Sequence, residues 1–265
     1  MPNDAWNPQQ YHRFAAERTQ PFLDLLDLVR PAEGGLARAV DLGCGSGELT
    51  AAAAARLAVA DMTGVDNSPA MLAEAAHHLR PGLTFEHGDI GAWTAPPQFD
   101  LVLANASLQW VPDHAAVLAQ WVAALRPGGQ LAVQVPANHD APSHTVAWEV
   151  AHLPEFAAAF GPGGPPADPV AENVLAPEAY SHLLHGLGLH APHVRLQVYP
   201  HVLASSRDVV EWVKGTTLTR FQRVLPADLF ARFLSAYEAR LLATIGQHEP
   251  YLFAFKRILM HGRLA

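Results

Sequence analysis

Three alternating glycines, Gly43, Gly45 and Gly47, follow an apolar stretch that ends in Asp41-Leu42 and precede a helical run from Glu48 to Leu57. Glycine is favoured where a chain turns tightly and lets a ligand approach its backbone. A strand, a glycine-rich turn and a helix in this order are typical of the first unit of a parallel α/β sheet. The loop therefore predicts a fold class and the position of a small-molecule site.

Strand-like and helix-like stretches alternate from Ala39 to Val135. Ser68 and Pro69 are typical of an N-cap and of a first helical position, and Arg126-Pro127-Gly128-Gly129 is expected to close the last of these helices. The expected strands cover residues 39–42, 61–66, 83–86, 99–104 and 130–135, and the expected helices cover residues 48–57, 69–78 and 113–125. Such alternation is the pattern of a doubly wound parallel sheet.

The pattern changes after Pro136, and the glycine- and proline-rich run from Gly161 to Pro166 is expected to be a loop or hinge. Further helices are expected at residues 11–29, 146–160, 177–185, 208–213 and 226–245, and strands at residues 193–202 and 251–260. We therefore predict an α/β, doubly wound, Rossmann-like fold. Its seven-stranded sheet is mostly parallel with an antiparallel last strand, and it carries helical lid and cap insertions.

Composition excludes several classes of function. The net charge of −8 over 265 residues argues against non-specific nucleic-acid binding, which needs a basic surface. No secretory signal is visible, and the stretch from Ala51 to Ala60 is too short to cross a bilayer. The single cysteine, Cys44, fits a reducing cytosol. The 15 histidines are scattered without metal-ligand spacing. We expect a cytoplasmic monomer or homodimer with no metal, no membrane contact and no nucleic-acid partner.

The glycine spacing also discriminates between cofactors. It is Gly-x-Gly-x-Gly, and Glu48 stands in the sixth position, where the dinucleotide pattern requires glycine. A carboxylate there repels a diphosphate, which disfavours an NAD-dependent oxidoreductase. S-adenosylmethionine has no phosphate and carries a sulfonium and an ammonium, so a nearby acid such as Asp41 favours it. The spacing predicts S-adenosylmethionine as the cofactor and methyl transfer as the reaction.

Polar residues follow the later expected strands at the same edge of the sheet. Asp66 stands where an acid receives ribose hydroxyls, although Asp66-Asn67-Ser68-Pro69 is also a turn and helix-cap sequence. Asp89 could accept a hydrogen bond from an adenine amino group and Ile90 could cover the ring, or Asp89 could be a solvated loop residue. Asn105 follows the fourth strand and is expected at the catalytic edge.

Four stretches carry a resemblance to the class I S-adenosylmethionine-dependent methyltransferases. They are Val40 to Gly47, Gly64 to Leu72, His87 to Ile90 and Ala104 to Trp110. More closely, the chain resembles the trans-aconitate 2-methyltransferase family, and this resemblance covers nearly its whole length. The stretches that carry it are Trp6-Asn7-Pro8, Asp24-Leu25-Leu26, residues 66–75, 104–114 and 131–136, Pro142-Ser143-His144, residues 212–216, and Phe255 with Arg257.

The resemblance implies methyl esterification of a carboxylate of a small di- or tricarboxylic acid, foremost trans-aconitate. A carboxylate is already ionised near neutral pH, so no general base is required, and positioning and desolvation carry the reaction. His144 and Arg220 are expected to position the substrate. The expected substrate-binding residues are Trp6, Tyr11, Arg18, His144, Lys214, Arg220 and Arg257, and the expected cofactor-binding residues are Asp41, Gly43, Gly45, Gly47, Asp66, Asn67, Asp89, Ile90, Asn105 and Trp110.

Each of these residues also has a purely structural interpretation. The cations could be solvated or cap helices, His144 could be a loop histidine, and the aromatic residues could pack in the core. Phe221 after Arg220 and Lys256 before Arg257 depart from the family pattern, which leaves the acceptor open. We divide the chain into an N-terminal helical lid (residues 1–34), an S-adenosylmethionine-binding Rossmann-like core (35–138), and substrate-cap helices with the sheet-completing strands (139–265).

Three other functions remain open at this point. A carboxyl methyltransferase acting on a malonyl-carrier protein needs a basic docking face. A small-molecule O- or N-methyltransferase needs a general base, for which His144 is the candidate. A non-catalytic S-adenosylmethionine-binding module needs only the loop and its acids.

Overall fold

The computed structural model describes residues 15–31, 33 and 35–265, with side chains from residue 19 onward. In this part of the chain the strands form one seven-stranded sheet in the order β3-β2-β1-β4-β5-β7-β6. Strands β1 to β5 pair in parallel, and β7 pairs antiparallel with both β5 and β6. The strands are β1 (Leu36–Leu42), β2 (Val59–Asp66), β3 (Leu83–His87), β4 (Phe99–Asn105), β5 (Leu125–Pro136), β6 (Leu189–Leu203) and β7 (Tyr251–Leu264). The predicted fold class is confirmed.

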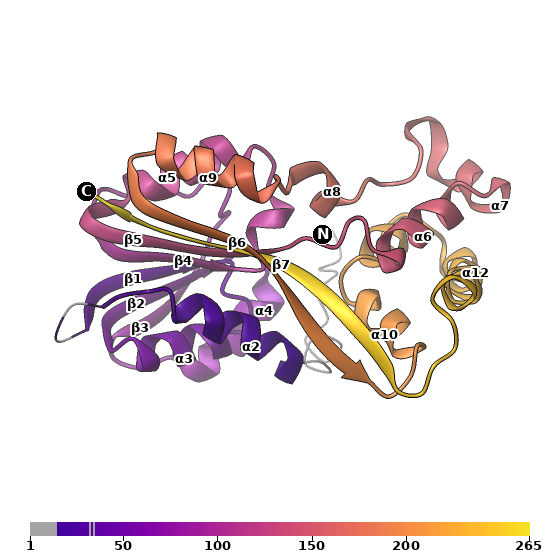
Figure 1. The fold of residues 1–265 in the computed structure, drawn as a ribbon, viewed down its shortest axis with the longest axis horizontal. Helices are drawn as coiled ribbons and strands as arrows, with labels where there is room; N and C mark the ends of the chain where they lie inside the picture. Colours follow the sequence, from indigo (N-terminus) through magenta and orange to yellow (C-terminus); the bar gives the residue numbers. More distant parts are fainter. Residues whose placement is uncertain (1–14, 32, 34) are drawn as a thin grey trace.

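Helices cover both faces of this sheet (Figure 1). On one face α2 and α3 pack through a cluster that includes Phe22, Leu25 and Met62. On the other face α5 and α9 pack through a cluster that includes Trp121 and Tyr180. The helices of the core are α2 (Ala15–Leu26), α3 (Glu48–Arg56), α4 (Pro69–Ala75), α5 (His114–Ala123) and α9 (Pro177–Gly186), with the 3-10 turns η1 (Ala76–His78) and η2 (Leu108–Trp110). Burial of both faces stabilises a parallel sheet.

The remaining helices form a cap beside the core (Figure 1). Strands β6 and β7 extend beyond the parallel strands as a two-stranded ribbon. The cap helices other than α8 (Pro169–Asn173) pack on it through a second hydrophobic cluster that includes Phe156, Trp212, Phe233 and Phe253, whereas α8 packs against η2. The cap helices are α6 (Pro142–Ala151), α7 (Pro154–Ala157), α8 (Pro169–Asn173), α10 (Asp208–Lys214), α11 (Thr219–Gln222) and α12 (Ala227–Ile245), with η3 (Ala158–Gly163). The cap therefore faces the carboxyl ends of β4 and β5.

Two expectations about single elements were wrong. Arg126 to Gly129 was expected to close the helix, but α5 ends at Ala123 and these residues belong to β5, where the pairing register with β4 shifts between Phe99 and Leu101. The bulge lets the chain leave α5 and enter the sheet without a separate loop. The helix expected over residues 146–160 is interrupted, with α6 ending at Ala151 and α7 beginning at Pro154. A residue before proline disfavours helical geometry, which explains the break.

The N-cap of α4 is confirmed, because Ser68 Oγ accepts a hydrogen bond from Met71 N at 3.2 Å. Helix α2 packs against the sheet, with Phe22 and Leu25 fully buried. The predicted lid of residues 1–34 includes residues 1–14, which lie outside the described part of the chain. Among the described helices there is none long and apolar enough to cross a membrane.

Candidate active site

Of the three glycines in the loop, Gly45 alone has open space beside its backbone. All three glycines have positive φ, at 85° for Gly43, 55° for Gly45 and 75° for Gly47. A Cβ at Gly43 would lie 2.2 Å from Ser107 Cβ, and one at Gly47 would lie 2.7 Å from Phe85, whereas one at Gly45 would meet no atom within 4 Å. Gly43 and Gly47 are thus required by packing, and Gly45 presents its backbone to open space, as a ligand-binding loop must.

Asp66 ties this loop to the next helix. Its Oδ2 accepts a hydrogen bond from Gly45 N at 2.8 Å, and its Oδ1 accepts one from Ser68 N at 2.8 Å. Asp66 therefore has the turn-forming role that the Asp66-Asn67-Ser68-Pro69 sequence suggested. A carboxylate has about four acceptor positions, so these two hydrogen bonds leave capacity for ribose hydroxyls.

Asp41 is a buried acid beneath the loop. Its Oδ2 accepts a hydrogen bond from Thr50 Oγ1 at 2.6 Å, and its Oδ1 has no hydrogen-bond partner among the described residues. Burial raises the pKa of this carboxyl from 3.8 to about 7, against the lowering effect of Thr50. An unpartnered buried acceptor is costly, and a cationic ligand beside the loop would satisfy it.

The other predicted cofactor residues end neighbouring strands. Asn67 and Asp89 are exposed after β2 and β3, and Asp89 Oδ1 accepts a hydrogen bond from Gly91 N at 2.9 Å. Ile90 is buried, and its carbonyl accepts a hydrogen bond from Trp121 Nε1 at 3.1 Å. Asn105 ends β4, and its Oδ1 is buried without a hydrogen-bond partner in the part of the chain that the structure describes.

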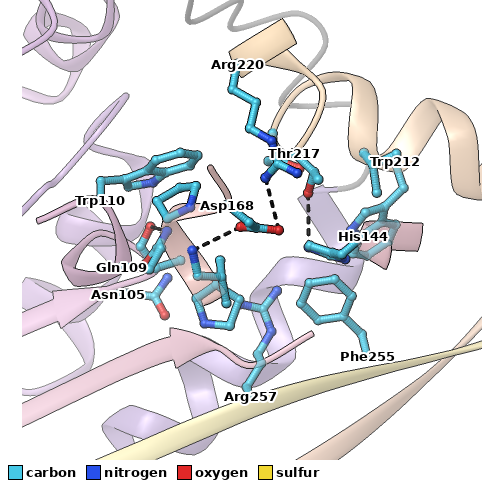
Figure 2. Close-up of a pocket in the computed structure, with 16 residues that line it drawn as sticks. Asn105, Gln109, Trp110, His144, Asp168, Trp212, Thr217, Arg220, Phe255 and Arg257 are labelled. Carbon is cyan, nitrogen blue, oxygen red and sulfur yellow. Dashed lines mark hydrogen bonds and ion pairs between the residues drawn. The ribbon is translucent and has the colours of Figure 1, made fainter. Parts of the chain in front are cut away.

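A pocket opens between this edge of the sheet and the cap (Figure 2). Its empty space is about 850 Å³ when the solvent-open mouth is included. The core contributes the ends of β4 and β5, β7 and the turn η2, and the cap contributes α6, α8, α10 and α11. The lining residues that carry the argument below are Asn105, His144, Asp168, Thr217, Arg220 and Arg257.

The turn after β4 joins the pocket to the glycine loop. Ala106 lines the pocket with φ of 54°, a conformation that costs energy outside glycine. Ser107 Oγ donates a hydrogen bond to Leu42 O at 2.6 Å, and Ser107 is the residue that Gly43 packs against. The free space at Gly45 and the pocket are therefore built on neighbouring segments, as two adjoining sites for donor and acceptor require.

Arg220 and Asp168 form an ion pair inside the pocket. Arg220 Nη1 lies 3.0 Å from Asp168 Oδ2, and the two side chains are only 9% and 11% exposed. None of the Arg220 guanidinium nitrogens has a hydrogen bond of acceptable geometry within the described chain. The Arg220 guanidinium also lies over the Phe221 ring, at 4.6 Å from its centroid. Arg220 is thus a buried cation that makes an ionic contact with Asp168, while its guanidinium N–H groups donate no hydrogen bond to any described residue.

Arg257 enters the pocket from β7 and is held differently. It is 5% exposed, its Nη1 donates a hydrogen bond to Gln134 Oε1 at 3.1 Å, and its guanidinium lies 4.9 Å from the centroid of the Phe255 ring. The preceding residue is fixed by Asn138, whose side-chain amide donates to Lys256 O at 2.9 Å and accepts from Lys256 N at 2.8 Å. Asn138 thereby extends the β5–β7 ladder and positions Arg257.

His144 is a buried helical residue and not a loop residue. It lies on α6, with Nδ1 3.0 Å from Ser143 Oγ and Nε2 3.0 Å from Thr217 Oγ1. Burial, as the largest cause, lowers its pKa from 6.5 to about 4. His144 is therefore neutral near pH 7, and both ring nitrogens already have hydroxyl partners, so it offers a hydrogen-bonding surface and not a proton sink.

The predicted substrate residues are only partly brought together. His144, Arg220 and Arg257 line the pocket, as does Trp110 from the cofactor set. Lys214 does not line it and pairs with Glu211 on its own helix. Trp6, Tyr11 and the side chain of Arg18 lie outside the described residues.

Asp168 and Thr217 line the pocket but were not predicted from the sequence. Asp168-Pro169 carries a helix-start signal, and Asp168 does accept a hydrogen bond from Val170 N at 3.0 Å. Its pairing with Arg220 has no local signal, because the two residues come from distant parts of the chain. No cluster of three or more histidine, cysteine, aspartate or glutamate residues suited to a metal occurs among the described residues.

Sequence comparisons relate this chain to known methyltransferases. A family model described as a methyltransferase domain matches residues 39–129. The "Trans-aconitate 2-methyltransferase" of Deinococcus radiodurans is 42% identical over 96% of this chain and 96% of its own length. The protein of the same name from Delftia acidovorans is 42% identical over 96% of this chain and 97% of its own.

Solved structures share the fold. Phosphoethanolamine N-methyltransferase 2 of Haemonchus contortus, solved with S-adenosylhomocysteine, superposes with a TM-score of 0.56 at 17% identity, covering 92% of this chain and 52% of that one. Fold and glycine loop together define a class I, S-adenosylmethionine-dependent methyltransferase. The full-length identity places the chain more narrowly: it belongs to the trans-aconitate 2-methyltransferase family.

Proposed function

We propose that this enzyme esterifies one carboxylate of a small di- or tricarboxylic acid with a methyl group from S-adenosylmethionine, and that trans-aconitate is its substrate. The observation that carries the proposal is the presence of two buried arginines, Arg220 and Arg257, in one pocket next to Asn105. Arginine forks suit carboxylates, and two of them suit a substrate with more than one. The names of the relatives at 42% identity support the same substrate.

We infer that the cofactor lies along Gly43, Gly45 and Gly47, with Asp41 facing its ammonium and Asp66 its ribose. The open space at Gly45 and the unpartnered Asp41 Oδ1 fit such a ligand. We assign the adenine to Asn67, Asp89 and Ile90, and the sulfonium end to Asn105 and Trp110. When bound, S-adenosylmethionine supplies a methyl group activated by its positive sulfur.

The residues of this chain then have to orient and desolvate a carboxylate. Arg220 and Arg257 hold the carboxylates that do not react, and the mostly apolar remainder of the wall, with Trp212 and Val213, excludes water from the one that does. No residue needs to remove a proton, because the nucleophile is already an anion. His144, neutral at pH 7, adds no charge to the wall, and its Nε2 holds Thr217 Oγ1 at 3.0 Å.

A substrate panel tests this proposal. Purified enzyme is incubated with S-adenosylmethionine and one of several acids: trans-aconitate, cis-aconitate, citrate, a dicarboxylate or a monocarboxylate. Mass spectrometry then detects the methyl ester. We expect turnover with trans-aconitate and little with the monocarboxylate. Absence of ester from every acid in the panel contradicts the proposal.

The rate profile separates esterification from the alternative with His144 as general base. Esterification predicts a kcat that is flat from about pH 6 to 8, because no group needs to lose a proton in that range. A kcat that rises through this range favours an O- or N-methyltransferase. The carrier-protein alternative is tested by adding a malonyl-carrier protein to the same panel.

Three further expectations are proposals of the same kind. We place the enzyme in the cytoplasm, expect a monomer or homodimer, and assign residues 1–34, 35–138 and 139–265 to lid, cofactor core and substrate cap. Light scattering on the purified protein measures the oligomeric state. Limited proteolysis with and without S-adenosylhomocysteine tests whether residues 1–34 act as a lid, through protection by the ligand.

A further inference from the structure

We propose that Asp168 is a specificity-determining residue that occupies Arg220 as an internal carboxylate, so that a ligand must bring a carboxylate of its own to replace it. This inference rests on the proposed function of the same pocket. It concerns a residue from the cap that lies between the two arginines in the view of Figure 2.

The contact between Arg220 and Asp168 is incomplete. The two groups approach to 3.0 Å, yet no guanidinium nitrogen of Arg220 forms a hydrogen bond of acceptable geometry with any described residue. Bidentate arginine–carboxylate pairs are strong because two parallel hydrogen bonds form at once. Arg220 therefore keeps its directional donors for an acceptor that approaches in line, as a substrate carboxylate can.

Asp168 also forms a hydrogen bond that does not depend on Arg220. Its Oδ1 accepts a hydrogen bond from Val170 N at 3.0 Å and caps the five-residue helix α8. Helix α8 itself is anchored to η2, because Asn173 Nδ2 donates a hydrogen bond to Gln109 O at 3.0 Å. Since Oδ1 holds the helix N-cap and Oδ2 holds Arg220, we expect Oδ2 to turn away from Arg220 while Oδ1 keeps its hydrogen bond to Val170 N.

The charges that line the pocket determine which acids can replace Asp168 on Arg220. Arg220 and Arg257 are cationic, Asp168 is anionic, and His144 is neutral, so Asp168 leaves one net positive charge on the lining. A monocarboxylate has only the group that must face the methyl donor, and it leaves Asp168 on Arg220. A di- or tricarboxylate exchanges a second carboxylate for Asp168 and gains the donors of Arg220. The internal pair therefore discriminates against acids with a single carboxylate.

The test removes the charge of Asp168 and keeps its shape. Asp168→Asn retains the helix cap, because asparagine caps helices as well as aspartate does. With Arg220 uncompensated, we expect KM for trans-aconitate to fall about tenfold with kcat nearly unchanged. We also expect acetate to become a competitive inhibitor at concentrations about tenfold lower than for the wild type. Binding of S-adenosylhomocysteine, measured by calorimetry, should not change.

Glu149→Gln is the matched control. Glu149 pairs with Arg240 on the outer surface of the same cap, at 3.2 Å and more than half exposed, so this variant removes an arginine-bound carboxylate outside the pocket. We expect its KM and its inhibition by acetate to equal those of the wild type. Asp168→Ser, which also preserves a capping oxygen, serves as the second pocket variant if the asparagine variant folds poorly.

The outcomes separate this inference from the proposed function. Wild-type turnover of trans-aconitate together with an unchanged or higher KM in both Asp168 variants would overturn the role of Asp168 and leave the function standing. A higher KM would show that Asp168 holds Arg220 in place for the substrate. No wild-type turnover of any acid would overturn the proposed function, and this inference with it.

Discussion

The two arginines of the pocket are buried by different means. Arg257 comes from β7, which lies between β5 and β6, and it is hydrogen-bonded to Gln134 of β5. Arg220 comes from the short helix α11 and is compensated by an ionic contact with Asp168. A buried charge without a partner is strongly destabilising, so each arginine requires its neighbour when the pocket is empty. Arg257 is held in place within the sheet by Gln134. Arg220 is held by Asp168, which we propose a substrate carboxylate can replace.

Arg220→Ala is expected to weaken binding of trans-aconitate by about 2 kcal/mol or more, because it removes a desolvated partner of a carboxylate. Affinity for S-adenosylhomocysteine should stay the same, since Arg220 lies in the cap and not on the glycine loop. Calorimetry with each ligand measures both effects. Arg223→Ala, which removes an exposed arginine at the end of the same helix, is the control. Equal affinity for trans-aconitate in both variants would refute the assignment.

Asp66→Ala is expected to abolish measurable binding of S-adenosylmethionine. The substitution removes the proposed ribose acceptor and also the carboxylate that holds Gly45 N and Ser68 N. Asp61→Ala, at the other end of the same strand and in a surface pair with Arg38, is the control and should bind normally. Fluorescence titration measures both variants, and wild-type affinity in Asp66→Ala excludes the role.

Asp41 predicts a pH dependence of cofactor binding. Its pKa is about 7 in the folded protein against 3.8 ordinarily, so the folded state holds an extra proton between these values. The contribution of Asp41 to the free energy of unfolding therefore falls as pH rises through this range. An ammonium beside Asp41 favours the ionised form, so affinity for S-adenosylhomocysteine should rise from about pH 6 to 8 with release of a proton. Calorimetry in buffers of different ionisation enthalpy counts that proton, and Asp41→Asn should lose the slope.

At the scale of elements, the β6–β7 ribbon determines where the cap lies. Strand β7 pairs with β5 inside the core and with β6 along its whole length, and Phe253 and Phe255 of its outer half belong to the cap cluster. The same strand also carries Arg257 into the pocket. Because one continuous strand joins the two hydrophobic clusters, the position of the cap relative to the sheet is tied to the position of Arg257.

Phe233 of helix α12 lies in the hydrophobic cluster of the cap, and its truncation measures how much that cluster contributes to the free energy of unfolding. Phe233 is fully buried, 4.8 Å from Phe221 and 5.5 Å from Phe156 between ring centroids. Phe233→Ala is expected to lower the free energy of unfolding of the cap by about 3–5 kcal/mol. KM for the acid should also rise, because Phe221 supports Arg220. Urea denaturation and steady-state kinetics test both effects. Phe230→Ala, which truncates a partly buried ring of the same helix, should cost less.

At the scale of the whole molecule, two bodies with separate hydrophobic clusters meet at one pocket. The parallel core carries the glycine loop, and the cap carries Asp168 and Arg220. The sites adjoin through the turn from Asn105 to Ser107, which lines the pocket and packs against Gly43. The donor is thus expected to bind the core, and the acceptor to bind between the core and the cap, where Arg257 and Arg220 line the same pocket.

The cofactor is therefore expected to stabilise the folded protein selectively. S-adenosylhomocysteine at a hundred times its Kd should add about 2.7 kcal/mol to the free energy of unfolding. NAD at the same concentration should add nothing, because Glu48 opposes a diphosphate at the loop. Thermal denaturation followed by fluorescence measures both. Stabilisation by NAD and not by S-adenosylhomocysteine would contradict the cofactor assignment.

The parallel core and the cofactor loop could be predicted from the sequence because their signals are local. The glycines at positions 43, 45 and 47, the helix N-cap at Ser68 and the alternation of strands and helices from Ala39 to Val135 each depend on residues close together in the chain. Predictions were less accurate where local signals conflict. The bulge at Arg126 to Gly129 resembles a turn, and the break before Pro154 lies inside a stretch with helical spacing.

By itself, then, the sequence determined the fold class, the cofactor and the edge of the sheet at which the site lies. Only the tertiary structure decided which cations line the pocket. It brought Arg220 and Arg257 into one pocket, left Lys214 outside it, and placed Asp168 on Arg220. The physical reason is that loop and helix signals arise between neighbouring residues, whereas a charge finds its partner through packing of elements that are distant in the chain.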